Sequence, residues 1–269
     1  MARTASPEKN RNGAPTAAPK GYRRRIRVIP QHGLVTALLE DDIHAMAVRL
    51  AHDGQKVVHI ESFLDRMPWN TCPGAAAVLV DTFAGLPLKE VTLRKARKAN
   101  CTHLHDLAVI AAEHAFDAEE ICFDISVSDP VAGRRELMLQ RNGSCALHWT
   151  EQDGQLVAPP EVAGRSLLTL RDALSAMTPQ EAEAGRLLQW AGLVAHGRTI
   201  PLERQNDALK MPPNCYTFQP DRARVARRIG EVVDFSDSER TPGEKLSREL
   251  RLTSGSRATR STQQNHGRE

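Results

Sequence analysis

The sequence predicts an α+β fold, an antiparallel sheet packed by helices, with a disordered tail at each end. Three observations predict it. Strand patterns fill the first part of the chain, and the apolar spacing then changes to that of helices. Asp-Gly and Asn-Gly pairs, which favour tight hairpin turns, separate neighbouring strand patterns. Both ends are polar and lack apolar periodicity, which is typical of disorder.

Four strands are expected first, at Tyr22–Ile29, Leu34–Glu40, Ile43–His52 and Lys56–Leu64. Asp53-Gly54 lies between the last two and is a strong hairpin signal, so the four strands form an antiparallel meander. The first strand carries the run Arg23-Arg24-Arg25-Ile26-Arg27. This run indicates a charged edge strand, since charges at an edge discourage pairing with another sheet.

Two helices follow the meander. Pro73–Ala84 has small apolar residues at helical spacing, with Thr71 as a candidate N-cap and Gly85 just beyond the end. Thr102–Phe116 brings its leucines and alanines onto one face. These two helices are expected to cover the sheet.

The chain then returns to strands before its last helices. Strands are expected at Glu120–Ser128, Glu136–Arg141 and Cys145–Thr150, a helix at Pro179–His196, and a short helix at Asp221–Arg228. The predicted organisation is a tail at 1–20, a single α+β domain at 21–236 and a second tail at 237–269.

Composition excludes several classes of function. No apolar run approaches the roughly 18 residues of a membrane helix, and no secretory leader precedes the domain, so a cytoplasmic protein without membrane contact is expected. The net charge is +3, but both tails are basic, which leaves residues 21–236 slightly acidic. A nucleic-acid partner is therefore not expected. Phosphate-loop and dinucleotide motifs are missing, so no nucleotide cofactor is expected either.

The cysteines are odd in number and widely spread, which favours reduced thiols: Cys72, Cys101, Cys122, Cys145 and Cys215. Cys72 and Cys101 each occur at the expected start of a helix. Free N–H groups and the helix dipole there lower a thiol pKa, and the thiolate binds metals or attacks electrophiles. The alternative is that each cysteine is a small buried apolar residue.

Two further clusters accompany these cysteines. His103 and Asp106 lie three apart on the second helix, so Asp106 could orient His103, and both are candidate catalytic residues. The alternative has His103 and His105 pointing to water. Asp42 and His44, two apart, project from the same face of the expected strand. With Cys72 and Cys101 they form an Asp/His/Cys/Cys set that suits zinc or iron, although Asp42 and His44 alone equally fit a turn.

Longer motifs resemble known families. The segments YRRRIRV, LEDDIHAMAVRLAHDG, RMPWNTCPGA and NCTHLHDLAVIAAEHA resemble a bacterial family named domain of unknown function 2889, over most of residues 22–236. The order of meander, Asp-x-His and two helix-start cysteines is also similar to U-type iron–sulfur cluster scaffold proteins. That similarity implies a site of Asp42, His44, Cys72 and Cys101 holding zinc or a nascent cluster. The first family cysteine is missing here, which puts cluster transfer in doubt.

These patterns favour a metal-binding protein with Cys72, Cys101 and His44 as ligands and Asp42 or His103 as the fourth. An open coordination position would permit hydrolase or lyase chemistry on a small molecule, and four protein ligands would make a structural site or a carrier that serves a metal-delivery partner. One alternative is a metal-free thiol enzyme, with Cys101 or Cys72 as nucleophile and His103 or His44 as base. Another is a non-catalytic binding module. The sequence leaves open whether the protein is an enzyme.

Overall fold

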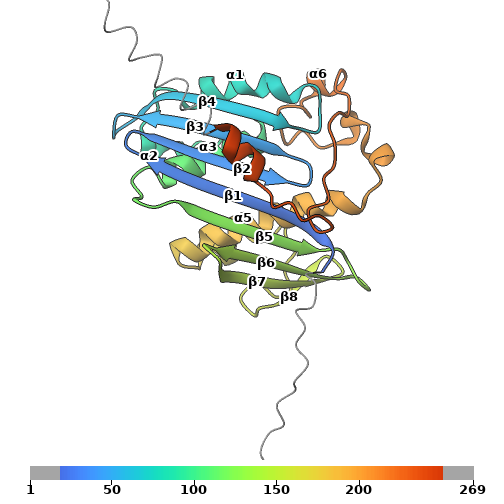
Figure 1. The fold of residues 1–269 in the computed structure, drawn as a ribbon. Coiled ribbons are helices and arrows are strands. Elements are labelled where there is room, and N and C mark those ends of the chain that lie inside the picture. The colour runs from blue at the N-terminus through green and yellow to red at the C-terminus, as the bar shows by residue number, and fades with distance from the viewer. Residues whose placement is uncertain (1–18, 251–269) are drawn as a thin grey trace, which may run out of the picture.

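A computed structural model describes residues 19–250, so most of both predicted tails, 1–18 and 251–269, lies outside the described residues. Eight strands form one antiparallel sheet with the order β4-β3-β2-β1-β5-β6-β7-β8 (Figure 1). The strands are β1 (Gly21–Gln31), β2 (Leu34–Asp41), β3 (Ala45–His52), β4 (Val57–Arg66), β5 (Ile121–Ser128), β6 (Arg134–Arg141), β7 (Ser144–Gln152) and β8 (Gln155–Ala158). The predicted α+β class and antiparallel sheet are confirmed.

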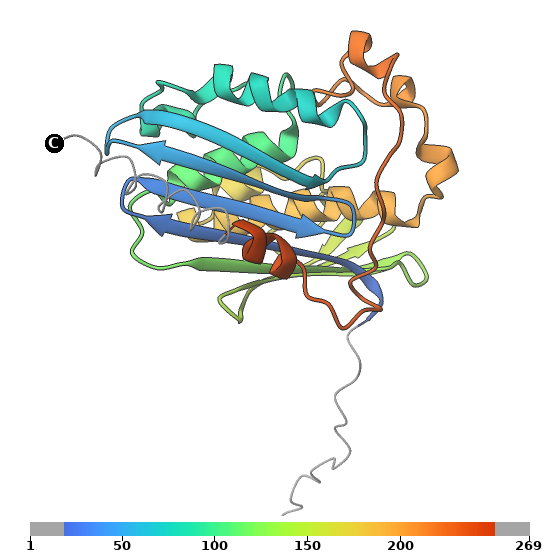
Figure 2. The same cartoon turned by 45° about the horizontal axis from the view of Figure 1, so that its top comes forward.

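The helices lie on one face of this sheet (Figure 2). They are α1 (Ala75–Phe83), α2 (Leu88–Val91), α3 (Thr102–Glu113), α4 (Arg171–Ser175), α5 (Pro179–Ala195) and α6 (Pro220–Ala223), with short 3-10 turns at Cys72–Gly74, His196–Thr199, Leu202–Gln205 and Ala208–Lys210. Helix α1 packs on β4, α3 on β1 to β3, and α5 on β5 to β7. The apolar face predicted for α3 is buried between the helix and the sheet. No helix of residues 19–250 is long and apolar enough to cross a membrane.

Strand β1 lies in the centre of the sheet, between β2 and β5, so its prediction as an edge strand is wrong. Three arginines of β1 each form an ion pair with a carboxylate of β2, of β5 or of the residue just before β5. Arg24 pairs with Asp41, Arg25 with Asp124 and Arg27 with Glu120. A strand rich in charge can therefore occupy the middle of a sheet when its charges are paired there.

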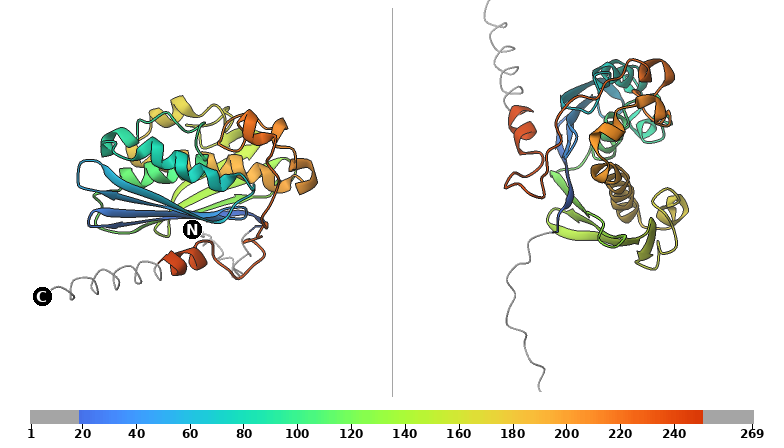
Figure 3. Two further views of the ribbon diagram at one scale, coloured as in Figure 1. Left: turned by 90° about the horizontal axis from the view of Figure 1, so that it is seen from above. Right: turned by 90° about the vertical axis from the view of Figure 1, so that its right-hand side faces the viewer.

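The C-terminal segment crosses the opposite face of the sheet, as Figure 3 shows. Residues 244–250 are helical, and Leu246 and Leu250 are buried against Leu38 and Ala47. The N–H of Gly243 donates to the carboxylate of Glu40 at 2.6 Å. Residues 237–250 of the predicted C-terminal tail are therefore described by the structure, and the end of this stretch packs on the sheet. The apolar contact of this helical segment comes from two leucines four positions apart. Two residues are too short a pattern to predict a helix from the sequence.

Candidate functional site

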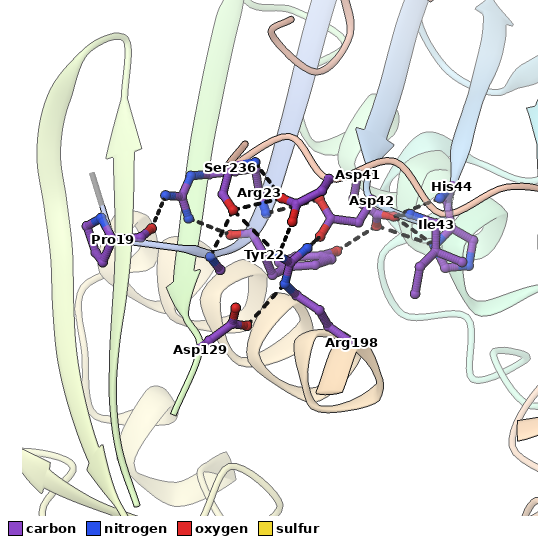
Figure 4. Close-up of polar contacts among 12 residues, drawn as sticks. Pro19, Tyr22, Arg23, Asp41, Asp42, Ile43, His44, Asp129, Arg198 and Ser236 are labelled. Carbon is purple, nitrogen blue, oxygen red and sulfur yellow. Dashed lines mark hydrogen bonds and ion pairs between the residues drawn. The ribbon is translucent and has the colours of Figure 1, made fainter. Parts of the chain in front are cut away.

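The site is built on the tight turn between β2 and β3. The N–H of Asp41 donates to the carbonyl of His44 at 2.8 Å, which closes the turn around Asp42 and Ile43. Oδ1 of Asp41 accepts the backbone N–H groups of Ile43 at 2.8 Å and His44 at 2.7 Å, a bonding pattern that aspartate often makes at turns. His44 Nδ1 lies 3.0 Å from the same oxygen. The turn thereby fixes the His44 ring against the Asp41 carboxylate (Figure 4).

Strand β1 supplies the other partners of Asp41. Tyr22 donates its hydroxyl to Oδ2 at 2.6 Å, and Arg24 donates Nη2 at 2.7 Å and Nε at 3.1 Å. Both side chains of the Arg24–Asp41 ion pair are fully buried. Burial favours the neutral acid, but His44 and Arg24 outweigh it and hold the pKa of Asp41 well below its usual range. Asp41 is therefore a carboxylate that only accepts hydrogen bonds.

Helices α3 and α5 complete the cluster from the other side. The His103 ring of α3 stacks on His44, with 3.9 Å between ring centroids. Nη2 of Arg24 donates to Nε2 of His103 at 3.3 Å, and Trp190 of α5 covers both residues. Burial lowers the pKa of His103 well below its ordinary value, and the charges of His44 and Arg24 add to this. His103 is a neutral imidazole.

Two more arginines hold the turn in place. Arg66 of β4 donates to the backbone carbonyls of Asp41 at 2.8 Å and Asp42 at 2.7 Å. Arg198 pairs with the carboxylates of Asp42, Asp129 and Asp234. These contacts tie the turn to β4 and to the segments that follow β5 and α6.

The predicted residues are distributed unevenly around this cluster. His44 and His103 come together, but the carboxylate beside them is Asp41. Because residues 42–44 form a turn and β3 begins at Ala45, Asp42 does not share a strand face with His44 and binds Arg198 instead. Asp106 pairs with Arg97 at 2.6 Å, and its hydrogen bonds go to Arg97 and His105 rather than to His103.

The alternative in which His103 and His105 point to water is wrong. Both are buried, at 8% and 5% exposed. His105 Nε2 lies 3.1 Å from the carbonyl of Arg94, which satisfies one ring nitrogen beneath the loop before α3. The helix face that buries Leu104 and Leu107 is thus wide enough to bury these histidines as well.

Cys72 and Cys101 do start their helical segments, at the 3-10 turn Cys72–Gly74 and as the N-cap of α3. Burial raises the pKa of Cys72, and it raises that of Cys101 to about 12, with Cys72 adding to the effect. Desolvation therefore outweighs the helix dipole, contrary to the predicted lowering. Among the described residues, the group whose ligand atoms lie close enough for one metal ion is Asp41, His44 and His103, without either thiol.

Four residues of the cluster were not predicted from the sequence: Tyr22, Arg24, Asp41 and Trp190. Asp41 directly precedes the turn, where an aspartate commonly caps the backbone, and this signal was available. Tyr22 and Arg24 are two apart on β1 and share its inner face. Nothing in the sequence indicates that Trp190, 87 residues after His103, packs on it.

The stretch that contains the turn and α3 is similar to a known protein family. Residues 30–117 match the family model described as "Protein of unknown function (DUF2889)". The matched stretch holds Asp41, His44 and His103, while Arg24 and Trp190 lie outside it. No curated protein and no solved structure matches the chain, and nothing in these comparisons supports the similarity to iron–sulfur scaffolds.

Proposed function

We propose that Asp41, His44 and His103 form a binding site for a transition metal ion, zinc or iron. The observation that carries this proposal is that one potential ligand atom from each side chain lies within 4.8 Å of the other two. Imidazole nitrogens and a carboxylate oxygen are ligands of both zinc and non-haem iron. The proposed set keeps His44 and His103 from the sequence-based hypothesis and replaces the thiols by Asp41.

His44 is oriented for this role by Asp41. Nδ1 of His44 lies 3.0 Å from Oδ1 of Asp41 and shares a proton with it, so an ion held by both atoms takes the place of that proton.

His103 offers the second nitrogen. Its ring is neutral, so binding a metal does not first require loss of a proton. Its Nε2 accepts a rather long hydrogen bond from Arg24, which a metal ion would displace. Arg24 opposes a nearby cation, but the adjacent Asp41 compensates its charge at 2.7 Å.

Such a site has coordination positions left for water or a small molecule. Two imidazoles and one carboxylate are three ligands, which do not complete the coordination shell of zinc or iron. An open position supports metal-assisted hydrolysis or lyase chemistry on a small substrate. The metal-free thiol enzyme has less support, because burial keeps Cys101 and Cys72 protonated at neutral pH.

The test is metal content and zinc titration of protein purified without a histidine tag. We expect about one equivalent of metal in the wild type, and an affinity lower by at least about tenfold in His44→Ala and in His103→Ala. Cys72→Ala and Cys101→Ala should keep the metal. His148→Ala is the matched control, since the His148 side chain is 56% exposed and lies outside the cluster.

The ligand set can be contradicted in two ways. Loss of metal in the cysteine variants, with retention in both histidine variants, would assign the site to the thiols. A wild type that takes up neither zinc nor ferrous iron would leave the cluster as a structural network.

A further inference from the structure

Arg24 carries a buried N–H group without a partner. Its side chain is fully buried, and Nε and Nη2 are used by Asp41 and His103. Nη1 has no hydrogen-bond partner among the residues that the structure describes. Buried donors in proteins are nearly always satisfied, so an orphan donor inside a polar cluster indicates an absent ligand or ordered water.

The planar guanidinium fixes where this donor points. Nε and Nη2 form one fork of parallel N–H groups, and Asp41 occupies it. Nη2 and Nη1 form the second fork, at the end of the side chain. One arm of that fork reaches His103 Nε2, so the unpaired N–H of Nη1 runs parallel to this bond, beside the imidazole. The ring centroid of Trp190 lies 4.3 Å from the guanidinium carbon, so this ring covers one face and leaves the edge of the guanidinium for a new ligand on that side.

We propose that this end fork of Arg24 binds a small carboxylate, one oxygen on Nη1 and the other on Nη2. The inference rests on the proposed metal site and names its substrate class. Arginine and carboxylate match in this two-point geometry, which is stronger and more specific than a single hydrogen bond. The carboxylate must be small, because His44 and His103 are only 7% and 8% exposed.

Carboxylate and metal are coupled through His103. When the carboxylate accepts the N–H of Nη2, the lone pair of His103 Nε2 is released for the metal. Binding of either ligand therefore breaks the Arg24–His103 hydrogen bond that competes with the other ligand. In addition, the negative charge of the carboxylate offsets the positive charge of the ion. By linkage, each must raise the affinity of the other by the same factor.

The first experiment titrates ¹³C-formate into metal-free wild-type protein and follows the ¹⁵N signals of the arginine side chains. We expect a saturable shift of the Arg24 signals. Arg135 is the internal control, since it is buried and its Nε and Nη2 bind Glu151 in the same way. Unchanged Arg24 signals, or equal shifts at Arg135, would overturn the inference without the need for any variant.

The second experiment measures zinc affinity with and without saturating formate. We expect about tenfold tighter zinc binding with formate in the wild type and in Arg135→Lys, and no enhancement in Arg24→Lys, which keeps the charge but loses the fork. An enhancement that persists in Arg24→Lys would mean that formate binds the ion alone and would overturn the role of Arg24.

These experiments test the metal site and the carboxylate site independently. A formate shift at Arg24 in a protein that takes up no metal refutes the metal site and keeps the carboxylate site. Zinc uptake that formate leaves unchanged refutes the carboxylate site and keeps the metal.

Discussion

Asp41 is the residue on which the buried network depends, because it receives hydrogen bonds from β1, from its own turn and from His44. We expect Asp41→Asn to destabilise the protein by about 3–5 kcal/mol, since it leaves the Arg24 charge buried and uncompensated. Urea unfolding at neutral pH measures this cost.

Asp124→Asn is the matched control for that change. It also removes a carboxylate from an arginine of β1, but the Arg25–Asp124 side chains are 25% and 32% exposed. Its cost should stay below about 1 kcal/mol, as for other accessible ion pairs. Equal costs for the two variants would show that burial of the Arg24–Asp41 pair is not what makes it important.

At this scale the sequence predicted part of the site. His44 and His103 stood out because imidazoles close to acids and thiols are unusual. Alternation along a strand puts Asp42 and His44 on one face and so predicts Asp42, but the chain turns here and brings Asp41 to His44 instead. The lowered thiol pKa predicted for Cys72 and Cys101 is wrong, because a helix start can be recognised in a sequence whereas burial of the thiol cannot.

Helices α3 and α5 are joined by His114, the C-cap residue of α3. Its Nδ1 lies 2.7 Å from Asp117 and its Nε2 lies 2.6 Å from Glu183 of α5, so both nitrogens face acceptors and the protonated ring satisfies them best. Burial opposes protonation, but these hydrogen bonds outweigh it and raise the pKa of His114. The ion pair therefore stabilises the fold most when the ring is charged.

This raised pKa gives a pH dependence with a definite sign. The contribution of His114 is fully present below its ordinary pKa of about 6.5 and is lost as pH rises through the folded value. We expect the difference in unfolding free energy between wild type and His114→Gln to be larger at about pH 5.5 than at about pH 9. Exposed His32, changed to Gln, should give no such trend. A difference that grows with pH would contradict the assignment.

Elements were easier to predict than their positions in the sheet. The strands of the meander and helices α3 and α5 lie within a few residues of their expected bounds, because period and turn residues are local signals. The central place of β1 was missed, since pairing of its arginines depends on residues as distant as Glu120 and Asp124.

For the whole molecule, the C-terminal helical segment covers apolar surface on the outer face of the sheet. Leu246 and Leu250 are 3% and 6% exposed. We expect the double change Leu246→Ala with Leu250→Ala to lower stability by at least about 2 kcal/mol, because both side chains leave apolar contacts. Thermal unfolding measures this, and faster hydrogen exchange at Gly243 should accompany it, since that amide is bonded to Glu40.

Leu168→Ala is the matched control for the C-terminal segment. Leu168 is 78% exposed, so the same change should stay within about 0.5 kcal/mol. An unaltered melting temperature in the double variant would mean that the segment does not hold its place on the sheet.

The residues of the buried cluster lie far apart in the sequence, so they are synthesised at different times. Asp41, His44 and His103 leave the ribosome long before Trp190, which closes over Arg24 and His103. Until residue 190 has been synthesised, the nascent chain therefore lacks the ring that covers the imidazole of His103 and the guanidinium of Arg24. The buried cluster with its aromatic cover can therefore be completed only late in synthesis, although three of its members are made early.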